Sequence, residues 1–254
     1  ITIPAGSLTG SANVYIYGDE VDEDDETFYI NLSTVSGGEG AIKGATTTAN
    51  VSIIDDDTAG FTLAQSGGST SVSEAGSTDS FTVVLNSNPT GNVVFTVTSS
   101  DTGEATVSPA TLTFTTGNWN SAQTITVTGV NDAIDDGNQN STTTIVINAG
   151  STADSNYDSV SSQTVTVTTT DDDTADFTIT ETSGTSVSEA GSTDTFTVVL
   201  NSEPTGNVVF GVTSSDTGEA TVSPSALTFN VGNWNNAQTI TVTGVDDSID
   251  DDNV

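Results

Sequence analysis

Short segments in which alternate residues are apolar recur along the chain, and this period of two predicts β-strands that bury one face. In DSFTVVLN (residues 79–86), Phe81, Val83 and Leu85 share one face of such a strand. The segment NPTG that follows at residues 88–91 has the composition of a turn. No stretch has apolar residues at helical spacing. The pattern therefore predicts an all-β protein.

The chain contains a long internal duplication. Residues 71–136 recur at 186–251, an offset of 115, with ten substitutions. The triplet DDD at residues 55–57 also recurs at 171–173. One repeat is therefore about 115 residues long and is bounded by DDD. We therefore expect three parts: a first unit (1–57) that is the C-terminal part of a repeat, a complete middle repeat (58–173), and a third unit (174–254) that is the N-terminal part of a further repeat.

The middle repeat carries about seven segments of strand character separated by turn residues. Many short strands at this spacing are typical of a β-sandwich, in which one face of each sheet packs inward and the serine and threonine face meets water. The expected strands lie at residues 61–65, 71–73, 79–86, 92–98, 111–114, 123–129, 142–149 and 163–170.

The two outer units are incomplete sandwiches by the same pattern. The first unit offers expected strands at residues 12–18, 27–33 and 48–54. Half a sandwich leaves an unpaired strand edge and an uncovered apolar face. We expect other chain to complete the first unit, either preceding residues of the same polypeptide or a neighbouring subunit in a polymer. Continuation of a longer array is favoured, because a head-to-tail complement between copies would duplicate strands.

The charge of the chain limits its partners. Lys43 is the only basic residue, and 35 Asp and Glu give a net charge of -34. Phosphates could not be neutralised, so nucleic acid is excluded, and an anionic membrane surface would repel the chain. No apolar run is long enough to insert into a membrane. A cationic partner is expected instead.

The acids are grouped at matching positions near the ends of expected strands. Two carboxylates about 4 Å apart repel by roughly 4 kcal/mol at an effective dielectric near 20. A hard divalent cation would reverse this, and Ca²⁺ suits an irregular site of many oxygens, whereas zinc is disfavoured without His or Cys. The plainer alternative is that the acids are solvated loop ends that keep the protein soluble. In the middle repeat the grouped acids are Glu74, Asp101, Glu104, Asp132, Asp135, Asp136, Asp171, Asp172 and Asp173.

Several of these segments resemble the Calx-beta domain, a family known from sodium/calcium exchangers and from tandem arrays in large bacterial surface proteins. They are SVSEAG, GVNDAIDD, GDEVDEDDETFYINL, and the closing SIIDDDTAGF and TTTDDDTADF. The resemblance implies tandem immunoglobulin-like seven-strand β-sandwiches with Ca²⁺ at the end nearest the next domain. Its implied ligands are Glu74, Glu104, Asp132, Asp136, Asp171, Asp172 and Asp173. After Asp136 the middle repeat departs from the family form, since GNQNSTTTIVI replaces DETFYINL.

Matching acids extend the set of candidate ligands beyond those seven residues. The middle repeat adds Asp135. The first unit contributes Asp19, Glu23, Asp55, Asp56 and Asp57, and the third unit contributes Glu189, Glu219, Asp247 and Asp251.

These observations lead to one expected function and two alternatives. We expect a non-catalytic structural extender, made rigid by calcium, in a secreted or cell-surface bacterial adhesin or filament protein. Its partners would be calcium ions and neighbouring repeats, including copies of itself in a polymer. The alternatives are a calcium-dependent module that recognises a glycan, surface or protein, and a cytosolic calcium sensor. An enzyme is not expected, because the acids outnumber a catalytic pair and no basic residue accompanies them. Trp119 and Trp234 are expected to pack rather than to bind sugar.

Overall fold

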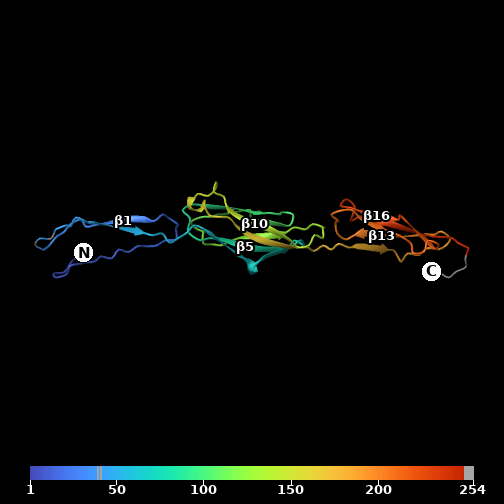
Figure 1. Cartoon of the computed structure of the whole chain (residues 1–254), viewed down its shortest axis with the longest axis horizontal. Coiled ribbons are helices and arrows are strands. Elements are labelled where there is room, and N and C mark those ends of the chain that lie inside the picture. The colour runs from blue at the N-terminus through green and yellow to red at the C-terminus, as the bar shows by residue number, and fades with distance from the viewer. Residues whose placement is uncertain (39, 41, 249–254) are drawn as a thin grey trace.

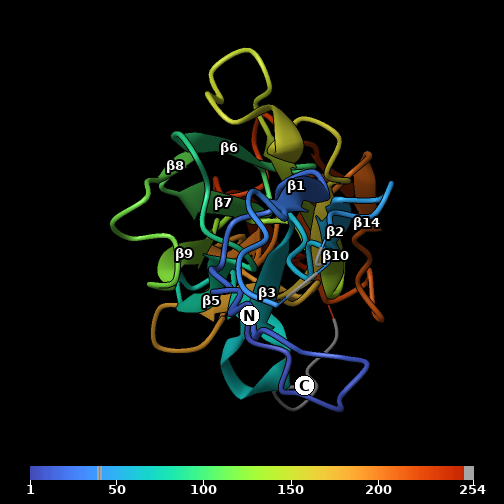
Figure 2. The ribbon, with the colours of Figure 1, turned by 90° about the vertical axis from the view of Figure 1, so that its left-hand side faces the viewer.

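Three β-rich units follow one another along a single long axis. The computed structural model describes residues 1–38, 40 and 42–248. The N-terminal hairpin and the third unit lie at opposite ends, with the middle repeat between them (Figure 1). Seen along the long axis, the units project onto one another within one rounded outline (Figure 2). The described residues contain no helix with the length and apolar character needed to cross a bilayer.

The middle repeat is a sandwich of two sheets. One sheet has the order β3-β5-β9-β7 and the other has the order β4-β11-β10-β6-β8. All neighbours are antiparallel except β4 and β11, which are parallel. The strands are β3 (Phe61–Gln65), β4 (Thr70–Ser73), β5 (Thr78–Leu85), β6 (Val93–Ser99), β7 (Ala105–Ser108), β8 (Thr111–Phe114), β9 (Gln123–Gly129), β10 (Gln139–Ile147) and β11 (Gln163–Thr170).

The all-β fold and the sandwich predicted from the sequence are confirmed, with nine strands in the middle repeat instead of seven. Eight of the nine match the segments expected from the sequence, and β7 is the additional strand. The short 3₁₀ turn η1 (Ser66–Gly68) separates β3 from β4, which belong to different sheets. Similarly, β7 lies in one sheet and β8 in the other.

The alternating residues of the middle repeat form its core. Phe81, Val83 and Leu85 on β5 are buried, as their spacing predicted. Phe95 on β6 lies at the centre, with its ring 5.0 Å from that of Phe61 in an edge-to-face contact. Such aromatic pairs stabilise beyond the area that they bury. The two sheets are therefore joined through an aromatic and aliphatic layer.

The third unit repeats only part of this sandwich. Its strands form one four-stranded sheet, β12-β13-β17-β15, and one pair, β14-β16. Trp119 packs against the core of the middle repeat and Trp234 against that of the third unit, as the packing interpretation predicted. The strands are β12 (Phe177–Glu181), β13 (Thr193–Leu200), β14 (Val208–Gly211), β15 (Ala220–Ser223), β16 (Ala226–Phe229) and β17 (Gln238–Gly244).

The first unit is a single two-stranded hairpin of β1 (Glu26–Asn31) and β2 (Thr48–Ile53). The prediction of a further strand at 12–18 is wrong, since these residues have no strand assignment. In the middle repeat the corresponding strand, β9, bonds to both β5 and β7. The described part of the first unit contains no strands equivalent to β5 and β7 with which residues 12–18 could bond. Without such neighbours, the alternating pattern does not produce a strand there.

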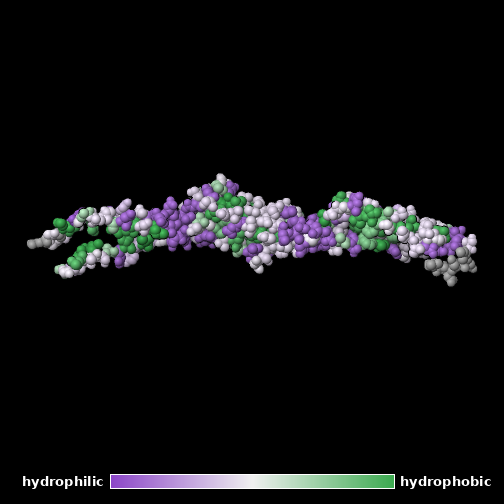
Figure 3. Space-filling view, viewed as in Figure 1, coloured by the Kyte–Doolittle hydropathy of each residue, from purple (hydrophilic) through white to green (hydrophobic). Residues whose placement is uncertain are grey.

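Polar and apolar surfaces alternate along the molecule. Hydrophilic bands lie between the units, while apolar residues show over the N-terminal hairpin and the third unit (Figure 3). On the hairpin, Tyr29 and Leu32 are exposed, and on the third unit Phe177 and Val209 are exposed. The two outer units thus leave apolar surface exposed, whereas the middle repeat covers its own apolar surface.

Candidate metal centre

Strand pairing brings two acidic segments of the middle repeat together. β4 runs parallel to β11, with Ser73 opposite Thr170. The pairing continues for one more residue, since the Glu74 N–H donates to the Thr170 carbonyl at 3.1 Å. Glu74 and Asp171 therefore leave the sheet side by side and in the same direction.

A second pairing brings the remaining acids to the same end. β7 begins opposite the end of β9, with Ala105 facing Gly129. The Val130 N–H then donates to the Glu104 carbonyl at 2.9 Å. Glu104 thus lies beside the connection from β9 to β10, which carries three further predicted ligands, Asp132, Asp135 and Asp136.

The two glutamates present buried carboxylate oxygens without partners. Glu74 is only 1% exposed, and its Oε2 atom accepts no hydrogen bond. The Oε2 atom of the half-buried Glu104 is likewise unpartnered. A buried carboxylate oxygen without a donor costs free energy that a cation or a proton would recover. These residues therefore suit a cation that prefers oxygen ligands.

The DDD triplet completes the candidate site. Glu74, Asp172 and Asp173 each place one carboxylate oxygen within 4.8 Å of the other two. Oxygens that share one calcium ion at 2.3–2.6 Å lie at most about 5 Å apart. Among residues 1–38, 40 and 42–248, no other three acids meet in this way. The kind and the spacing of these oxygens suit calcium, which would need further oxygen ligands to complete its six to eight.

Burial and, after it, mutual repulsion change the acidity of this cluster. Burial, followed by the nearby Asp171 carboxylate, raises the pKa of Glu74 to about 7. Burial is also the main cause that raises the pKa of Glu104 and that of Asp173. Asp171 behaves oppositely, because the backbone N–H groups of Asp173 and Gly137 donate to it and lower its pKa. At neutral pH the cluster without metal thus holds charge that the fold disfavours.

A dependence of stability on pH follows for the protein without metal. The pKa of Glu74 is about 7 in the folded chain, against an ordinary value of 4.5. The folded state therefore binds more protons between these values, and its stability should fall as pH rises from about 4.5 to beyond 7. Urea unfolding at pH 5 and pH 8 in metal-free buffer measures this loss. Glu74→Gln should reduce the loss, whereas Glu181→Gln on exposed β12 should leave it unchanged; equal losses in both variants would contradict the assignment.

Two of the predicted ligands also shape the loops. Asp171 accepts the Asp173 N–H at 2.8 Å and the Gly137 N–H at 2.7 Å. Asp132 accepts the Ile134 N–H at 2.8 Å. The bond from the Gly137 N–H holds the triplet against the β9–β10 connection, and the other two bonds shape each loop locally. Asp171 and Asp132 therefore position the site as well as adding charge to it.

The first unit gathers a second group of predicted ligands. The acids line a hollow of about 90 Å³ after β2. Asp55 accepts the Asp57 N–H at 3.2 Å and the Glu23 N–H at 3.0 Å, repeating the bonds of Asp171. The neighbouring Asp19 carboxylate is the main cause that raises the pKa of Glu23, and burial that of Asp57. The predicted ligands brought together here are Asp19, Glu23, Asp55, Asp56 and Asp57.

Among the described residues of the third unit, the predicted ligands do not meet in such a group. Glu189 is exposed, although it occupies the same place in the repeat as the buried Glu74. Glu219 keeps the position of Glu104, since its carbonyl accepts the Val245 N–H at 2.8 Å. Asp247 follows β17, and Asp251 lies outside the described residues. The difference arises because, in the part of the chain that the structure describes, no strand equivalent to β11 lies beside residues 185–188 to cover Glu189.

Each acidic end is bonded to the start of the next unit. Asp135 accepts the Ala175 N–H at 2.7 Å, and the Ala133 carbonyl accepts the Glu203 N–H at 2.6 Å. Asp135 therefore connects the β9–β10 loop of the middle repeat to the linker that follows the DDD triplet of the same repeat.

The joint between the first unit and the middle repeat has the same construction. Asp22 accepts the Ala59 N–H at 3.0 Å, and the Glu20 carbonyl accepts the Asn88 N–H at 2.5 Å. The Asp22 carbonyl also accepts from the Asn156 side chain. Asp22 was not among the predicted ligands, but its alignment with Asp135 in the repeat was the signal that could have identified this role.

Three of the solved structures that match this chain are distantly similar to it. CBD12 from CALX1.2 matches at 17% identity and a TM-score of 0.31, covering 74% of this chain and 76% of that one. Domains 1–6 of the surface layer protein SbsC match at 18% and 0.30, covering 79% and 24%. The YadV chaperone matches at 7% and 0.33, covering 75% and 88%. These scores are too low to support an argument.

The sequence comparisons are more decisive. A search of curated proteins found no match. The family model of the Calx-beta domain matches residues 4–57, 60–173 and 171–254, which together span nearly the whole chain. These matches include all the acidic strand ends described above. The chain therefore belongs to the Calx-beta domain family.

Proposed function

We propose that this chain is a non-catalytic structural extender of an extracellular or cell-surface bacterial protein, and that calcium makes its joints rigid. The supporting observation is the bond from the Asp135 carboxylate to the Ala175 N–H. It links the acidic loop to the linker that leads into β12. The same bond recurs between Asp22 and Ala59 at the preceding joint. Rigidity at every joint is what a spacer requires.

The residues of the middle repeat have separate tasks in this proposal. Glu74, Asp172 and Asp173 hold the ion, with Glu104 close by. Asp171 fixes the triplet through the Gly137 N–H, and Asp135 fixes the linker. Bound calcium supplies the positive charge that offsets repulsion between these carboxylates. The loop and the linker then have one preferred arrangement.

An extracellular location is consistent with sites of modest affinity. Extracellular calcium modules commonly have Kd values of about 10⁻⁴ to 10⁻³ M. Calcium near millimolar concentration outside cells would occupy such sites. Near-identity of the repeated segments also favours a spacer, because recognition of a partner requires only one specialised copy.

Replacement of the triplet tests the proposed ligands. The variant with Asp171→Asn, Asp172→Asn and Asp173→Asn should bind calcium at least about tenfold more weakly at this site, since it removes three anionic charges. Its strands should persist, because the triplet follows β11. Calorimetric titration and far-UV circular dichroism measure the two effects. Unchanged stoichiometry and affinity would refute the assignment.

The extender function is tested at the joint itself. Because the chain has no cysteine, spin labels can be placed at Val146→Cys in the middle repeat and Val209→Cys in the third unit, both exposed positions. We expect a narrow distribution of label distances with calcium and a broad one with chelator. Asp135→Ala, which removes the acceptor of the Ala175 N–H, should broaden the distribution in calcium, whereas Glu181→Ala should not. Equal widths with and without calcium would refute calcium-dependent stiffness.

A further inference from the structure

We propose that one contact pair at each joint selects which repeat can follow which, because at most one residue of the pair carries a carboxylate. The pair joins a residue in the acidic loop of one unit, Glu20 or Ala133, to a residue in a turn of the next unit, Asn88 or Glu203. The proposal deepens the extender function proposed above, since it concerns the same joints. The contact itself needs no bound ion.

The two joints make this contact in the same way. At the first joint, the Glu20 carbonyl accepts the Asn88 N–H at 2.5 Å. At the second joint, the Ala133 carbonyl accepts the Glu203 N–H at 2.6 Å. In both loops, the aspartate two residues further along accepts an N–H of the linker. The contact pair is therefore a repeated feature of the joint.

The turns that enter the two contacts differ only at the contact residue. The turn between β5 and β6 reads NSNPTG at residues 86–91, and the turn between β13 and β14 reads NSEPTG at residues 201–206. The difference replaces the neutral Asn88 with the acidic Glu203. It is one of only two differences between the duplicated segments that change the charge. A change of charge therefore falls on the residue that touches the preceding unit.

The loops differ at the contact in the opposite sense. The first unit has the acidic Glu20 there, and the middle repeat has Ala133. Glu20 thus meets the neutral Asn88, whereas Glu203 meets the neutral Ala133. Each joint contains one carboxylate in the pair, and neither joint contains two.

A second carboxylate in the pair would be unfavourable for two reasons. A backbone hydrogen bond between the two residues keeps their side chains close, so two negative charges there would repel. The surroundings also remove water, since the Oδ1 atom of Asn88 is buried without a partner. No cationic side chain can compensate, because Lys43, the only basic residue, lies in the connection between β1 and β2. Burial of an unpaired charge is costly.

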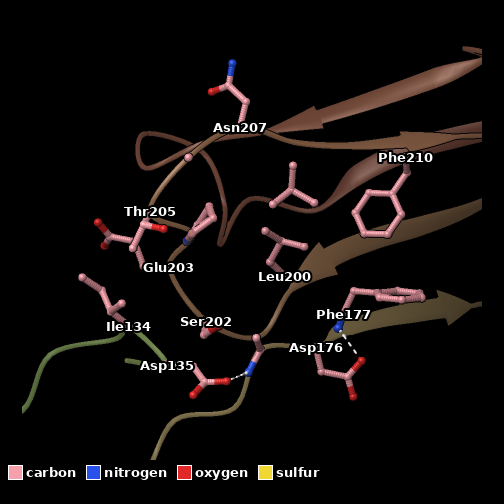
Figure 4. A pocket seen from close by; sticks show the side chains of 14 residues that line it. Ile134, Asp135, Asp176, Phe177, Leu200, Ser202, Glu203, Thr205, Asn207 and Phe210 are labelled. Atoms are coloured by element: carbon pink, nitrogen blue, oxygen red, sulfur yellow. Dashed lines mark hydrogen bonds between the residues drawn. The ribbon is translucent and has the colours of Figure 1, made fainter. Parts of the chain in front are cut away.

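The second joint shows where such a charge would lie. A hollow of about 430 Å³ is lined by Ile134 and Asp135 from the loop of the middle repeat and by Glu203 from the turn of the third unit (Figure 4). Ala133 directly precedes Ile134 and is half-buried. A glutamate at position 133 would therefore bring a further carboxylate to Glu203, beside that of Asp135.

The pair distinguishes repeats that are otherwise nearly identical. A loop with glutamate at the contact, as in the first unit, accepts the turn of the middle repeat and disfavours the turn of the third unit. A loop with alanine accepts the turn with glutamate. The order of units along the chain is thus matched joint by joint, although the sandwiches themselves would be interchangeable.

The substitution Ala133→Glu tests the pair in the full chain, since it places the loop residue of the first unit in front of the third unit. Spin labels at Val146→Cys and Val209→Cys report on this joint. In calcium, the distribution of label distances should broaden at least about twofold, because the two carboxylates repel. Ala133→Gln has the same length without the charge and should leave the width near that of the parent chain.

A second substitution tests whether the two positions act together. Glu203→Asn reproduces the turn of the middle repeat, so it should restore the narrow distribution in the Ala133→Glu chain and change little by itself. Potassium chloride at about 1 M should also narrow the distribution, since the screening length falls to about 3 Å. The proposal would be overturned by an unchanged width in Ala133→Glu, by equal broadening in Ala133→Gln, or by a broad distribution that Glu203→Asn does not reduce.

The same labels separate this inference from the role of calcium. Equal widths in the parent chain with calcium and with chelator would refute the calcium-dependent stiffness proposed above. The contact pair would still be decided by Ala133→Glu and by its reversal in the double variant. Conversely, a calcium-dependent width that Ala133→Glu does not alter would keep the proposed function and overturn the contact pair.

Discussion

Removal of calcium should lower the midpoint of thermal unfolding of the middle repeat by about 5 °C. An ion bound only to the folded state adds roughly 1.4 kcal/mol at ten times its Kd. Each kcal/mol shifts the midpoint of a domain near this size by about 4 °C. The unpartnered oxygens of Glu74 and Glu104 explain why the loss is large, since chelation leaves them buried beside other carboxylates.

Scanning calorimetry of the full chain with millimolar calcium and with excess chelator measures this difference. Potassium chloride at matched ionic strength is the control, because salt alone screens the surface acids. A shift of less than a few degrees would contradict the metal centre. A shift of the same size in potassium chloride would attribute the effect to screening.

Gly129→Ala should destabilise the middle repeat and weaken its calcium site together. A Cβ atom on Gly129 would lie 2.1 Å from the Ser73 carbonyl oxygen. The end of β9 therefore passes directly against β4, and any side chain must push β4 away. Glu74 directly follows Ser73, so the displacement moves a proposed ligand. We expect a loss of about 1–3 kcal/mol in the free energy of unfolding.

Gly117→Ala is the matched control, because the nearest atom to its Cβ would be 3.8 Å away. Urea unfolding and calcium titration of both variants give the comparison. The close approach recurs at Gly244, whose Cβ would lie 2.1 Å from the Ser188 carbonyl oxygen. A Gly129→Ala protein with unchanged stability and calcium affinity would show that β4 is not fixed against β9.

The core of the middle repeat could be predicted because its strands alternate strictly. Phe81, Val83 and Leu85 required only the period of two to be placed inside. β7 could not be predicted, since ATVS is short and its pairing depends on the far end of β9. The strand expected at 12–18 failed for a related reason. A pattern specifies which face is apolar, but neighbouring strands decide whether the segment joins a sheet.

The candidate site was predictable in part from the repetition of acids at strand ends. Parallel pairing of β4 with β11 was not evident in the sequence, yet it places Glu74 beside Asp171. The identical sequence context of Glu189 gave no sign that this residue would be exposed. Burial of a carboxylate here depends on a strand about 100 residues away along the chain. Local pattern cannot encode such a contact.

The parallel pairing of β4 with β11 determines how the array responds to tension. A pull along the long axis draws the beginning of the middle repeat one way and its end the other. β4 lies near the first end of the chain of this repeat and β11 near the last, so the force slides one strand along the other. Their hydrogen bonds, from Val167 opposite Thr70 to Thr170 opposite Ser73, are then loaded together instead of opening one at a time. The repeat is thus built to resist stretching, and an ion between Glu74 and the triplet would fasten the two strands where that sliding begins.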